Sequence, residues 1–553
     1  MPLFKPSQLP AALLLLAGAI SLCPPTQAAD WPMWRFDAQR SAASPQQLPA
    51  ALQPLWQQHY GPRQPAWDDP LNLDLMTYDR VFEPIVLGNR LFMGFNDSDK
   101  LLALDTRTGQ ELWRFYAEGP VRLPPVGWQG RVYFCSDDGY LYCVSAETGE
   151  LQWKFDGAPN RQQALGNRRL ISAWPARGGP VIRDGNVYFC ASIWPFMGTF
   201  LYALDADTGE VRWVNDSTGA QFIKQPHSAP SFAGVAPQGA LVATESLLIV
   251  PGGRSVPAVF DRGSGTLRYF ELNAGGKGSG GSFVTADEKY FYVHTREKGT
   301  RAFHLGDGVK TAFMPNEPVL AEGRVYSAEL VEGQAVVRAY GADDALLWQV
   351  AADGRGDLIL AGQQLVAAGA DSISIIQLPT AEREAEVVYS LPVAAAVERL
   401  LVADDKLFAI TLEGHLLAFG PSPSAPEGAP AATSVAAGST PPASPTAAAT
   451  SPTTAPAPPL LTELLQAGQA EGYALWFGRA DDSLLDTLVA HSPFTQLAVV
   501  DHDGQRVNRL RRQLDAAGRY GQITAHHATA EAFAAPPYVA HQLFVATNLA
   551  TEA

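Results

Sequence analysis

The stretch that decides the fold is residues 201–213, with the sequence LYALDADTGEVRW, because the chain contains two further close copies of it. Residues 101–113 read LLALDTRTGQELW, and residues 141–153 read LYCVSAETGELQW. Each copy begins with the alternating apolar residues of a half-buried strand, turns at a Thr-Gly pair where glycine accepts a positive φ, and resumes as a strand ending in Trp. A unit of this kind cannot bury its faces alone, so the repeats predict a stacked or circular all-β array.

The shared pattern Ala-x-Asp-x-x-Thr-Gly-x-x-x-Trp resembles the repeat of the pyrroloquinoline-quinone-like (quinoprotein-like) β-propellers, in which the Trp docks between adjacent blades. The middle copy departs from it at Cys143 and Ser145, and weaker copies follow at residues 259–269, 302–313 and 339–348. The fully matching residues are Ala103, Asp105, Thr108, Gly109 and Trp113, and then Ala203, Asp205, Thr208, Gly209 and Trp213. The resemblance implies a mainly β fold in which these Trp residues are structural.

The strand-rich units number eight, which predicts an eight-bladed β-propeller over residues 30–420. Strand pairs are expected near residues 83–113, 124–153, 180–213, 230–269, 282–313, 318–348, 357–376 and 397–420. The last unit ends without a Thr-Gly turn or a Trp strand, whereas LWQQHY at residues 55–60 looks like a Trp strand without the strand and turn that should precede it. We therefore expect residues 54–60 to close the ring beside residues 415–420, which removes an exposed edge. The predicted blade-docking residues are Trp56, Trp113, Trp153, Trp213 and Trp348.

The segments that flank the repeats predict export and a flexible connection. Residues 1–29 carry Lys5, an apolar run and a small-residue end, which is the layout of a signal peptide and predicts a periplasmic or cell-envelope protein. A lipid anchor at Cys23 is the alternative. Residues 421–459 contain no aromatic residue and one charge, Glu427, so they are expected to be a disordered linker rich in Pro, Ala, Ser and Thr.

The three cysteines that remain after removal of a signal peptide leave two possibilities open. Cys135 and Cys143 flank a turn, where a three-residue hairpin loop would place them opposite each other and within reach of a disulfide. The other interpretation, which we prefer, treats both and Cys190 as small buried apolar residues. Their spacing matches no zinc or haem motif.

Residues 460–553 change character, because short apolar strands alternate with helical periodicity. Strands are expected at 473–477, 496–500, 523–527 and 543–545, and helices at 482–491 and 505–517, which predicts a small parallel α/β domain. The segment resembles the first half of a Rossmann-type S-adenosylmethionine methyltransferase, in which a glycine turn follows strand one and an acid ends strand two. Gly478 and Asp501 match those cofactor-binding positions. Arg479 and the following acidic residues stand where further glycines are expected, so the domain is predicted to be partial and degenerate.

Composition and motifs favour a binding protein over an enzyme. The net charge is −16 and the repeats carry no dense basic stripe, which argues against nucleic acid as a partner. No apolar run has the length of a membrane span. Quinoprotein dehydrogenases hold their cofactor between a Trp and a disulfide of adjacent cysteines beside Ca²⁺, and this chain has no Cys-Cys pair. The sequence thus predicts a non-catalytic binding or scaffold module without a cofactor, catalytic residue or metal, and with a protein or envelope component as partner. The alternatives are a dehydrogenase using pyrroloquinoline quinone and a methyltransferase using S-adenosylmethionine.

Overall fold

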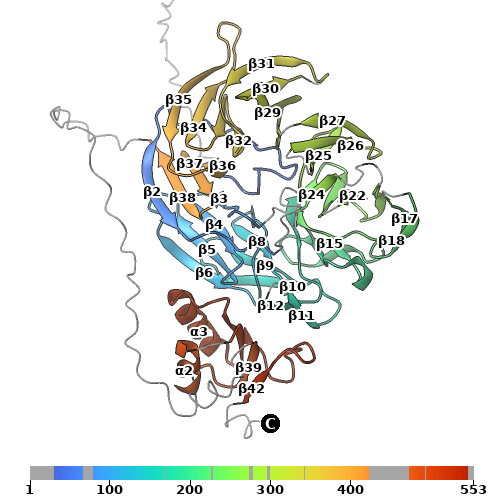
Figure 1. Cartoon of the computed structure of the whole chain (residues 1–553), viewed down its shortest axis with the longest axis vertical. Helices are drawn as coiled ribbons and strands as arrows, with labels where there is room; N and C mark the ends of the chain where they lie inside the picture. Colours follow the sequence, from blue (N-terminus) through green and yellow to red (C-terminus); the bar gives the residue numbers. More distant parts are fainter. Residues whose placement is uncertain are drawn as a thin grey trace, which may run out of the picture.

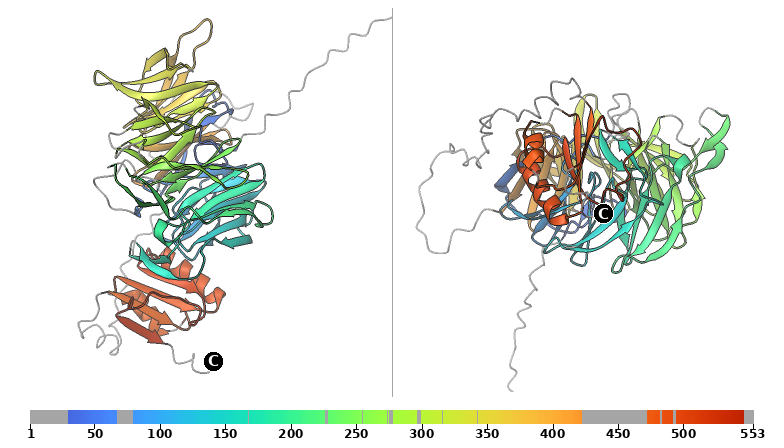
Figure 2. Two further views of the ribbon diagram at one scale, coloured as in Figure 1. Left: turned by 90° about the vertical axis from the view of Figure 1, so that its right-hand side faces the viewer. Right: turned by 90° about the horizontal axis from the view of Figure 1, so that it is seen from below.

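The computed structural model describes two folded parts, a ring of eight antiparallel β-sheets and a small α/β domain at its side (Figures 1 and 2). The described residues are 30–66, 79–166, 168–225, 228–253, 255–272, 274, 278–295, 299–314, 316–341, 343–421, 472–481, 483–491 and 494–545. The ring is an eight-bladed β-propeller, and the fold class expected from the repeats is confirmed. The predicted signal peptide with Cys23, and all but the first residue of the predicted linker, lie outside the described residues.

The first three blades contain the clear sequence repeats and blade 4 a weaker one, and each is built from consecutive antiparallel strands. Blade 1 is β3 (Ile85–Leu87), β4 (Arg90–Phe95), β5 (Lys100–Asp105) and β6 (Glu111–Tyr116). Blade 2 is β7 (Val126–Trp128), β8 (Arg131–Cys135), β9 (Tyr140–Ser145) and β10 (Leu151–Asp156). Blade 3 is β13 (Gly178–Arg183), β14 (Asn186–Ala191), β15 (Phe200–Asp205) and β16 (Val211–Asn215), joined by β19 (Gly239–Ala240). Blade 4 is β20 (Val242–Ala243), β21 (Leu247–Gly252), β22 (Ser255–Asp261) and β23 (Leu267–Tyr269).

The last four blades keep this architecture although the Thr-Gly and Trp signature fades. Blade 5 is β24 (Ser279–Ala286), β25 (Tyr290–Thr295), β26 (Gly299–His304) and β27 (Lys310–Met314). Blade 6 is β28 (Val319–Ala321), β29 (Arg324–Val331), β30 (Gln334–Tyr340) and β31 (Leu346–Ala351). Blade 7 is β32 (Asp357–Ala361), β33 (Gln364–Ala368), β34 (Ser372–Gln377) and β35 (Glu386–Pro392), joined by β1 (Ala43–Ser44). Blade 8 is β36 (Val397–Ala403), β37 (Lys406–Thr411), β38 (His415–Gly420) and β2 (Gln53–His59).

The N-terminus closes the ring as expected, since β2 is the outer strand of blade 8. Its antiparallel register runs from Gln53 opposite Gly420 to His59 opposite His415. Figure 1 shows β2 in blue beside β38 in orange, although the two strands are more than 350 residues apart in sequence. The seam hides the β38 edge that the end of the repeats would otherwise leave exposed, and the prediction of closure by residues 54–60 is confirmed.

Neighbouring blades are locked together by a Trp of one blade that packs on the Thr-Gly turn of the next. Trp56 of blade 8 lies against Gly109 of blade 1, where an added Cβ would come within 2.6 Å of the indole ring, and its Nε1 donates to the Thr106 carbonyl at 2.9 Å. Because Gly109 also has a φ of +69°, the turn needs glycine for conformation and for space. The same contact recurs for Trp113 on Gly149, Trp153 on Gly209, Trp213 on Gly265 and, with a tyrosine, Tyr269 on Gly308. Trp348 instead lies next to Tyr326 of its own blade.

The C-terminal domain is a parallel sheet with helices on one face. Its elements are β39 (Tyr473–Phe477), α2 (Ser483–His491), β40 (Gln496–Asp501), α3 (Gly504–Ala516), β41 (Ile523–His527) and β42 (Gln542–Val545). The strand order is β41-β40-β39-β42, and every pairing is parallel. The helices and strands predicted for this segment are present within a few residues, whereas its methyltransferase-like identity stays a prediction.

Docking on the propeller covers part of the other face of this sheet. The hairpin of β11 (Gln163–Gly166) and β12 (Arg169–Ser172) places Leu170 in a buried apolar cluster with Leu475, Ala498 and Val500. At the edge of the interface Asp515 accepts from Lys100 Nζ and from Arg114 Nη1, both at 2.6 Å. The β11–β12 hairpin therefore forms part of the contact between the two parts of the chain, together with Lys100 and Arg114 of blade 1.

The cysteines differ from the expected register. The turn between β8 and β9 contains four residues, so Cys135 lies opposite Leu141 and Cys143 lies opposite Tyr133. Cys135, Cys143 and Cys190 are free and buried. The expected pairing of Cys135 with Cys143 was wrong, and the preferred interpretation of small buried side chains agrees with the structure.

The ring seam gives a test of blade docking. Trp56→Ala should lower the free energy of unfolding of the propeller by about 2–4 kcal/mol, because the indole fills the space over Gly109 and donates a hydrogen bond there. Urea unfolding followed by fluorescence measures the effect. Trp194→Ala is the control, since this indole is 45% exposed, and it should cost less than about 1 kcal/mol. Equal losses in the two variants would contradict the assigned role of Trp56.

Candidate functional site

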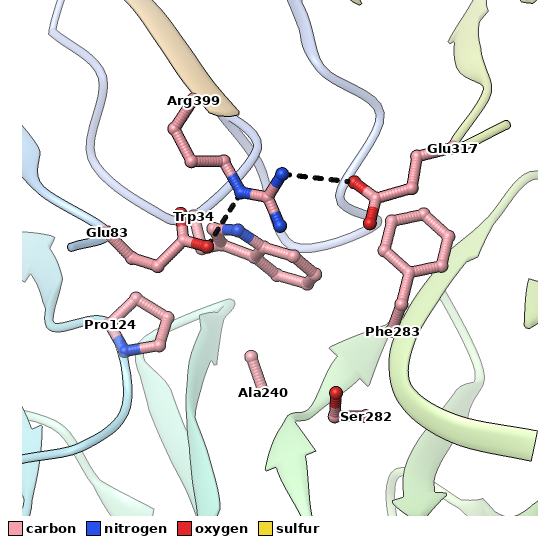
Figure 3. A pocket seen from close by; sticks show the side chains of 8 residues that line it. All are labelled: Trp34, Glu83, Pro124, Ala240, Ser282, Phe283, Glu317 and Arg399. Carbon is pink, nitrogen blue, oxygen red and sulfur yellow. Dashed lines mark hydrogen bonds and ion pairs between the residues drawn. The ribbon is translucent and has the colours of Figure 1, made fainter. Parts of the chain in front are cut away.

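A buried cluster of five charged side chains occupies the axis of the ring, where a propeller could hold a ligand. Arg35 comes from the N-terminal segment, Glu83 precedes β3, Glu317 precedes β28, Asp357 starts β32 and Arg399 lies in β36. Four of the five come from the innermost strands of blades 1, 6, 7 and 8 or directly precede them, and Arg35 comes from the N-terminal segment, so the fold brings together positions that are far apart in sequence. Figure 3 shows Arg399 between Glu83 and Glu317.

The cluster is held by ion pairs on both sides of each arginine. Arg399 Nε donates to Glu83 Oε1 at 2.7 Å, and its Nη1 lies 3.6 Å from Glu317 Oε2. Arg35 Nη1 lies 3.5 Å from Glu317 Oε2 and 3.6 Å from Asp357 Oδ1. Two guanidinium groups thus face three carboxyl groups, and each arginine contacts two of them.

Burial and charge divide the carboxyl groups into two kinds, those with a raised pKa and one with a lowered pKa. Burial raises the pKa of Glu83 to about 7 and that of Asp357 to about 6, although neighbouring arginines oppose the shift. Burial acts in the same direction on Glu317, but Arg399 and then His294, whose Nε2 lies 2.9 Å from Glu317 Oε1, hold its pKa below the usual range. The axis can therefore keep a proton on Glu83 near neutral pH while Glu317 stays ionised.

The space left on the axis is small. The cavity lined by Trp34, Glu83, Phe283, Glu317 and Arg399, among others, has a volume of about 10 Å³. This is the room that one water molecule needs. A tricyclic quinone does not fit there while Arg35, Trp34 and the ion pairs hold their positions. Among the described residues no group of three or more His, Cys, Asp or Glu side chains could hold a metal ion.

The Gly478 and Asp501 positions in the C-terminal domain come together, and protein groups already occupy the acid. Asp501 Oδ2 accepts from Ala480 N at 2.8 Å and from Arg506 Nε at 2.7 Å, and Oδ1 accepts from Asp503 N and from Arg506 Nη2. Burial would raise the pKa of Asp501, but these hydrogen bonds, first that from Arg506, lower it. A ribose hydroxyl would have to displace Arg506 before it could reach this carboxylate.

An exposed aromatic surface lies on a hairpin that projects from the ring between blades 3 and 4 (Figure 1). Phe222 of β17 (Gln221–Lys224) and Phe232 of β18 (Pro230–Ala233) pair across the hairpin with ring centroids 5.3 Å apart, and they are 65% and 77% exposed. The short helix η1 (Pro195–Met197) packs at the hairpin base and adds Trp194 and Phe196, which is 79% exposed. We call these four side chains the aromatic surface.

Sequence reasoning found the seam and the docking residues but missed both the axial cluster and the aromatic surface. The predicted docking residues Trp56, Trp113, Trp153 and Trp213 each lie at a blade junction. Nothing in the sequence around Glu83 or Arg399 marks them as partners, because they belong to no repeat motif. The signal for the aromatic surface was present as aromatic residues in two inter-strand stretches, where an apolar core position is not expected.

The ring of eight blades, with Trp docked on the Thr-Gly turn of the next blade, is a β-propeller whose repeats are similar to those of the quinoprotein-like propellers. The family described as "Outer membrane protein assembly factor BamB" matches residues 51–308, which is just under half of the chain. This match ends at the glycine turn on which Tyr269 docks, where the repeat signature fades.

Three known proteins illustrate what the chain is similar to. The dehydrogenase subunit of a quinone-dependent alcohol dehydrogenase from Gluconobacter oxydans is 31% identical over 145 residues, which are 24% of this chain and 18% of that protein. The structure of BamB from Moraxella catarrhalis has 13% identity and a TM-score of 0.43, covering 67% of this chain and all of that one. The quinohemoprotein alcohol dehydrogenase from Comamonas testosteroni has 14% identity and a TM-score of 0.49, covering 74% and 83%. The chain spans about a fifth of the length of the curated relatives it matches. In the part of the chain that the structure describes, no helix is both long and apolar enough to cross a membrane.

The raised pKa of Glu83 predicts a pH-dependent contribution to stability. A carboxyl that keeps its proton to about pH 7 when folded, but ionises near its model value of 4.5 when unfolded, stabilises the fold at low pH and loses this effect as the pH rises to 7. Glu83→Gln removes the titration. The wild type should therefore lose stability relative to Glu83→Gln between pH 5 and 7, by up to about 1.4 kcal/mol per pH unit.

Urea unfolding at several pH values measures that difference. Glu147→Gln, an exposed turn position in blade 2, is the matched control and should follow the wild type at every pH. A constant difference between wild type and Glu83→Gln across this range would contradict the assigned protonation.

Proposed function

We propose that the propeller is a binding module that engages another protein through the aromatic surface on its β17–β18 hairpin, and that it carries out no chemistry on its axis. The exposure of Phe222 and Phe232 carries the binding part of this proposal. The cavity beside the axial ion pairs, of about 10 Å³, carries the other part, and the larger cavity of about 650 Å³ shares no lining residue with it, since it lies between residues 37–47 and blades 5 to 7. Export to the periplasm or cell envelope is part of the same proposal and rests on the layout of residues 1–29.

The aromatic surface suits a protein partner. Each aromatic side chain can bury about 150–250 Å², so four largely exposed ones offer a few hundred Å² on a projecting element. That is in the range of the largest apolar patch on a monomer, and such patches often mark interaction sites. Aromatic residues are also enriched in the energetic centre of protein interfaces.

A quinoprotein oxidoreductase is the second candidate, and the comparisons favour it over a scaffold. Five curated relatives in the matched region are dehydrogenases, and four of them are the dehydrogenase subunit of a quinone-dependent alcohol dehydrogenase. Pyrroloquinoline quinone is therefore the cofactor to test. Against it stand the small axial cavity and the absence of adjacent cysteines in the sequence, so binding would require movement of Arg35 or Trp34.

Site-specific photo-crosslinking tests the binding function in the native host. A photoreactive phenylalanine analogue at position 222 should give one discrete crosslinked product, because this side chain faces solvent beside Phe232. The same analogue at Leu346, an exposed apolar position on blade 6, is the matched control and should give none. Phe232→Ser should abolish the product at position 222. Equal products at both positions, or none at position 222, would contradict the proposal.

A dye-linked oxidation assay tests the second candidate. Purified protein supplied with pyrroloquinoline quinone and Ca²⁺ should not oxidise primary alcohols or sugars, because the axis is filled by side chains. The ultraviolet-visible spectrum of protein isolated from its host should likewise lack a quinone band. Alcohol oxidation that depends on added quinone, and is abolished by removing Ca²⁺, would favour the oxidoreductase instead.

A further inference from the structure

The cavity of about 650 Å³ opens between residues 37–47 and blades 5, 6 and 7, where the repeat has decayed. The last strand of blade 5, β27, contains no Trp, and blade 6 has GADDA at residues 341–345 in place of a Thr-Gly turn. Among the described residues, the Trp docked on a glycine turn is therefore missing at this junction. The volume lies in the usual range for small-molecule sites, which is about 300–1,000 Å³.

One tyrosine hydroxyl in this cavity lacks the partner that its counterparts have. Tyr133 of blade 2 and Tyr188 of blade 3 lie opposite the same repeat position as Tyr292 of blade 5. Tyr133 Oη donates to the Ala206 carbonyl at 2.8 Å, and Tyr188 Oη accepts from an arginine of the next blade at 3.2 Å. Tyr292 is 3% exposed and lines the cavity, and its hydroxyl forms no hydrogen bond with a described residue. The cavity thus presents a buried, unpaired hydroxyl to whatever fills it.

Carboxylates outnumber basic groups around the cavity. The five acidic lining residues are Asp37, Asp287, Glu288, Glu322 and Asp344, and the two basic ones are Lys289 and Arg324, so the net charge of the lining is −3. Asp287 is half-buried and held in place, because its Oδ1 accepts from Lys289 N and Tyr290 N, both at 2.7 Å. Its Oδ2 accepts from no described residue and is left for a ligand.

The distribution of these charges suits an extended cation and not a metal ion. In the part of the chain that the structure describes, no three His, Cys, Asp or Glu side chains lie close enough to hold one ion. The carboxylates come from the N-terminal segment, from the β24–β25 turn of blade 5 and from two turns of blade 6. Leu320 and Val325 supply apolar lining between them. A ligand with separated positive charges on an aliphatic chain meets several carboxylates at once.

We propose that this cavity binds a linear organic cation with at least two ammonium groups on an aliphatic chain. One ammonium group donates to Asp287 and to the Tyr292 oxygen, and a second reaches the carboxylates of blade 6. Asp287 and Asp344 lie near Tyr292, since their charges add to burial in raising the pKa of its hydroxyl. A free polyamine and the lysine side chains of a peptide both carry this chemistry. The site shares no residue with the axial cavity or the aromatic surface, so its failure leaves the proposed function untouched.

Calorimetric titration of the full chain with spermidine tests the site. We expect one saturable equivalent, with an affinity that falls as NaCl is added because charges make the contact. Asp287→Asn keeps the turn but removes a charge, and Tyr292→Phe removes only the hydroxyl, so each should lower the affinity by about tenfold. Asp307→Asn is the matched control and should bind as the wild type does, because Asp307 is an exposed turn residue of the same blade that accepts from Val309 N.

Two further ligands make the result decisive. Butylamine, which has one ammonium group, should bind at least about tenfold more weakly than spermidine. A capped Lys-Ala-Lys peptide distinguishes the two sources, since tighter binding of the peptide, weakened by Asp287→Asn, assigns the cavity to lysine side chains of a protein. Equal thermal midpoints of wild type and Tyr292→Phe show that the fold is retained. No saturable binding of either polycation, or unchanged affinity in both Asp287→Asn and Tyr292→Phe, would overturn the proposal.

Discussion

The structure depends on the N-terminal segment of residues 31–44, which crosses the ring and makes contact with nearly every blade. Two of its arginines, Arg35 and Arg40, adopt positive φ and are buried, so the segment follows a path that only fixed partners can hold. Arg40 Nη2 donates to the carbonyls of Pro180 and Leu241, which belong to two neighbouring blades. Backbone or side-chain hydrogen bonds join the segment to Val86, Gly127, Pro180, Ala243, Ala286, Leu320 and Leu360, which cover blades 1 to 7.

This arrangement explains why weak repeats can still form blades. At the junctions 8–1, 1–2, 2–3, 3–4 and 4–5, a Trp or Tyr of one blade docks on a glycine turn of the next and holds the two blades together at the periphery of the ring. Blades 6 and 7 lack that contact among the described residues, and there the segment takes its place nearer the axis, with Leu320 N bonded to Ser41 O and β1 added to β32 in parallel. The ring is thus secured from outside where the repeat is strong and from inside where it has decayed.

Local patterns predicted the blades, the seam and the strands of the C-terminal domain because each depends on a short periodic stretch. LWQQHY at residues 55–60 carried enough information to place β2, since a lone Trp strand needs a partner. The axial cluster could not be predicted from the sequence, because Arg35, Glu83 and Arg399 meet only after the ring closes. Arg511 of α3 is 3% exposed and pairs with Glu118 at 2.7 Å, since the docked propeller covers that face, and the local helical pattern could not reveal this contact. The cysteine register differs because the turn lies one residue earlier than expected, so that Cys135 faces Leu141 and not Cys143.

The packing that stabilises the ring also restricts where a ligand can reach it. Five charges and the segment fill the axis, and docking of the α/β domain buries the β41 side of that sheet, where His527 N donates to Glu118 Oε2 at 3.2 Å. Replacing any axial arginine with a ligand would leave buried carboxylates without a partner, which costs several kcal/mol. The surface proposed for binding lies further out, on the β17–β18 hairpin, where Phe222 and Phe232 are 65% and 77% exposed.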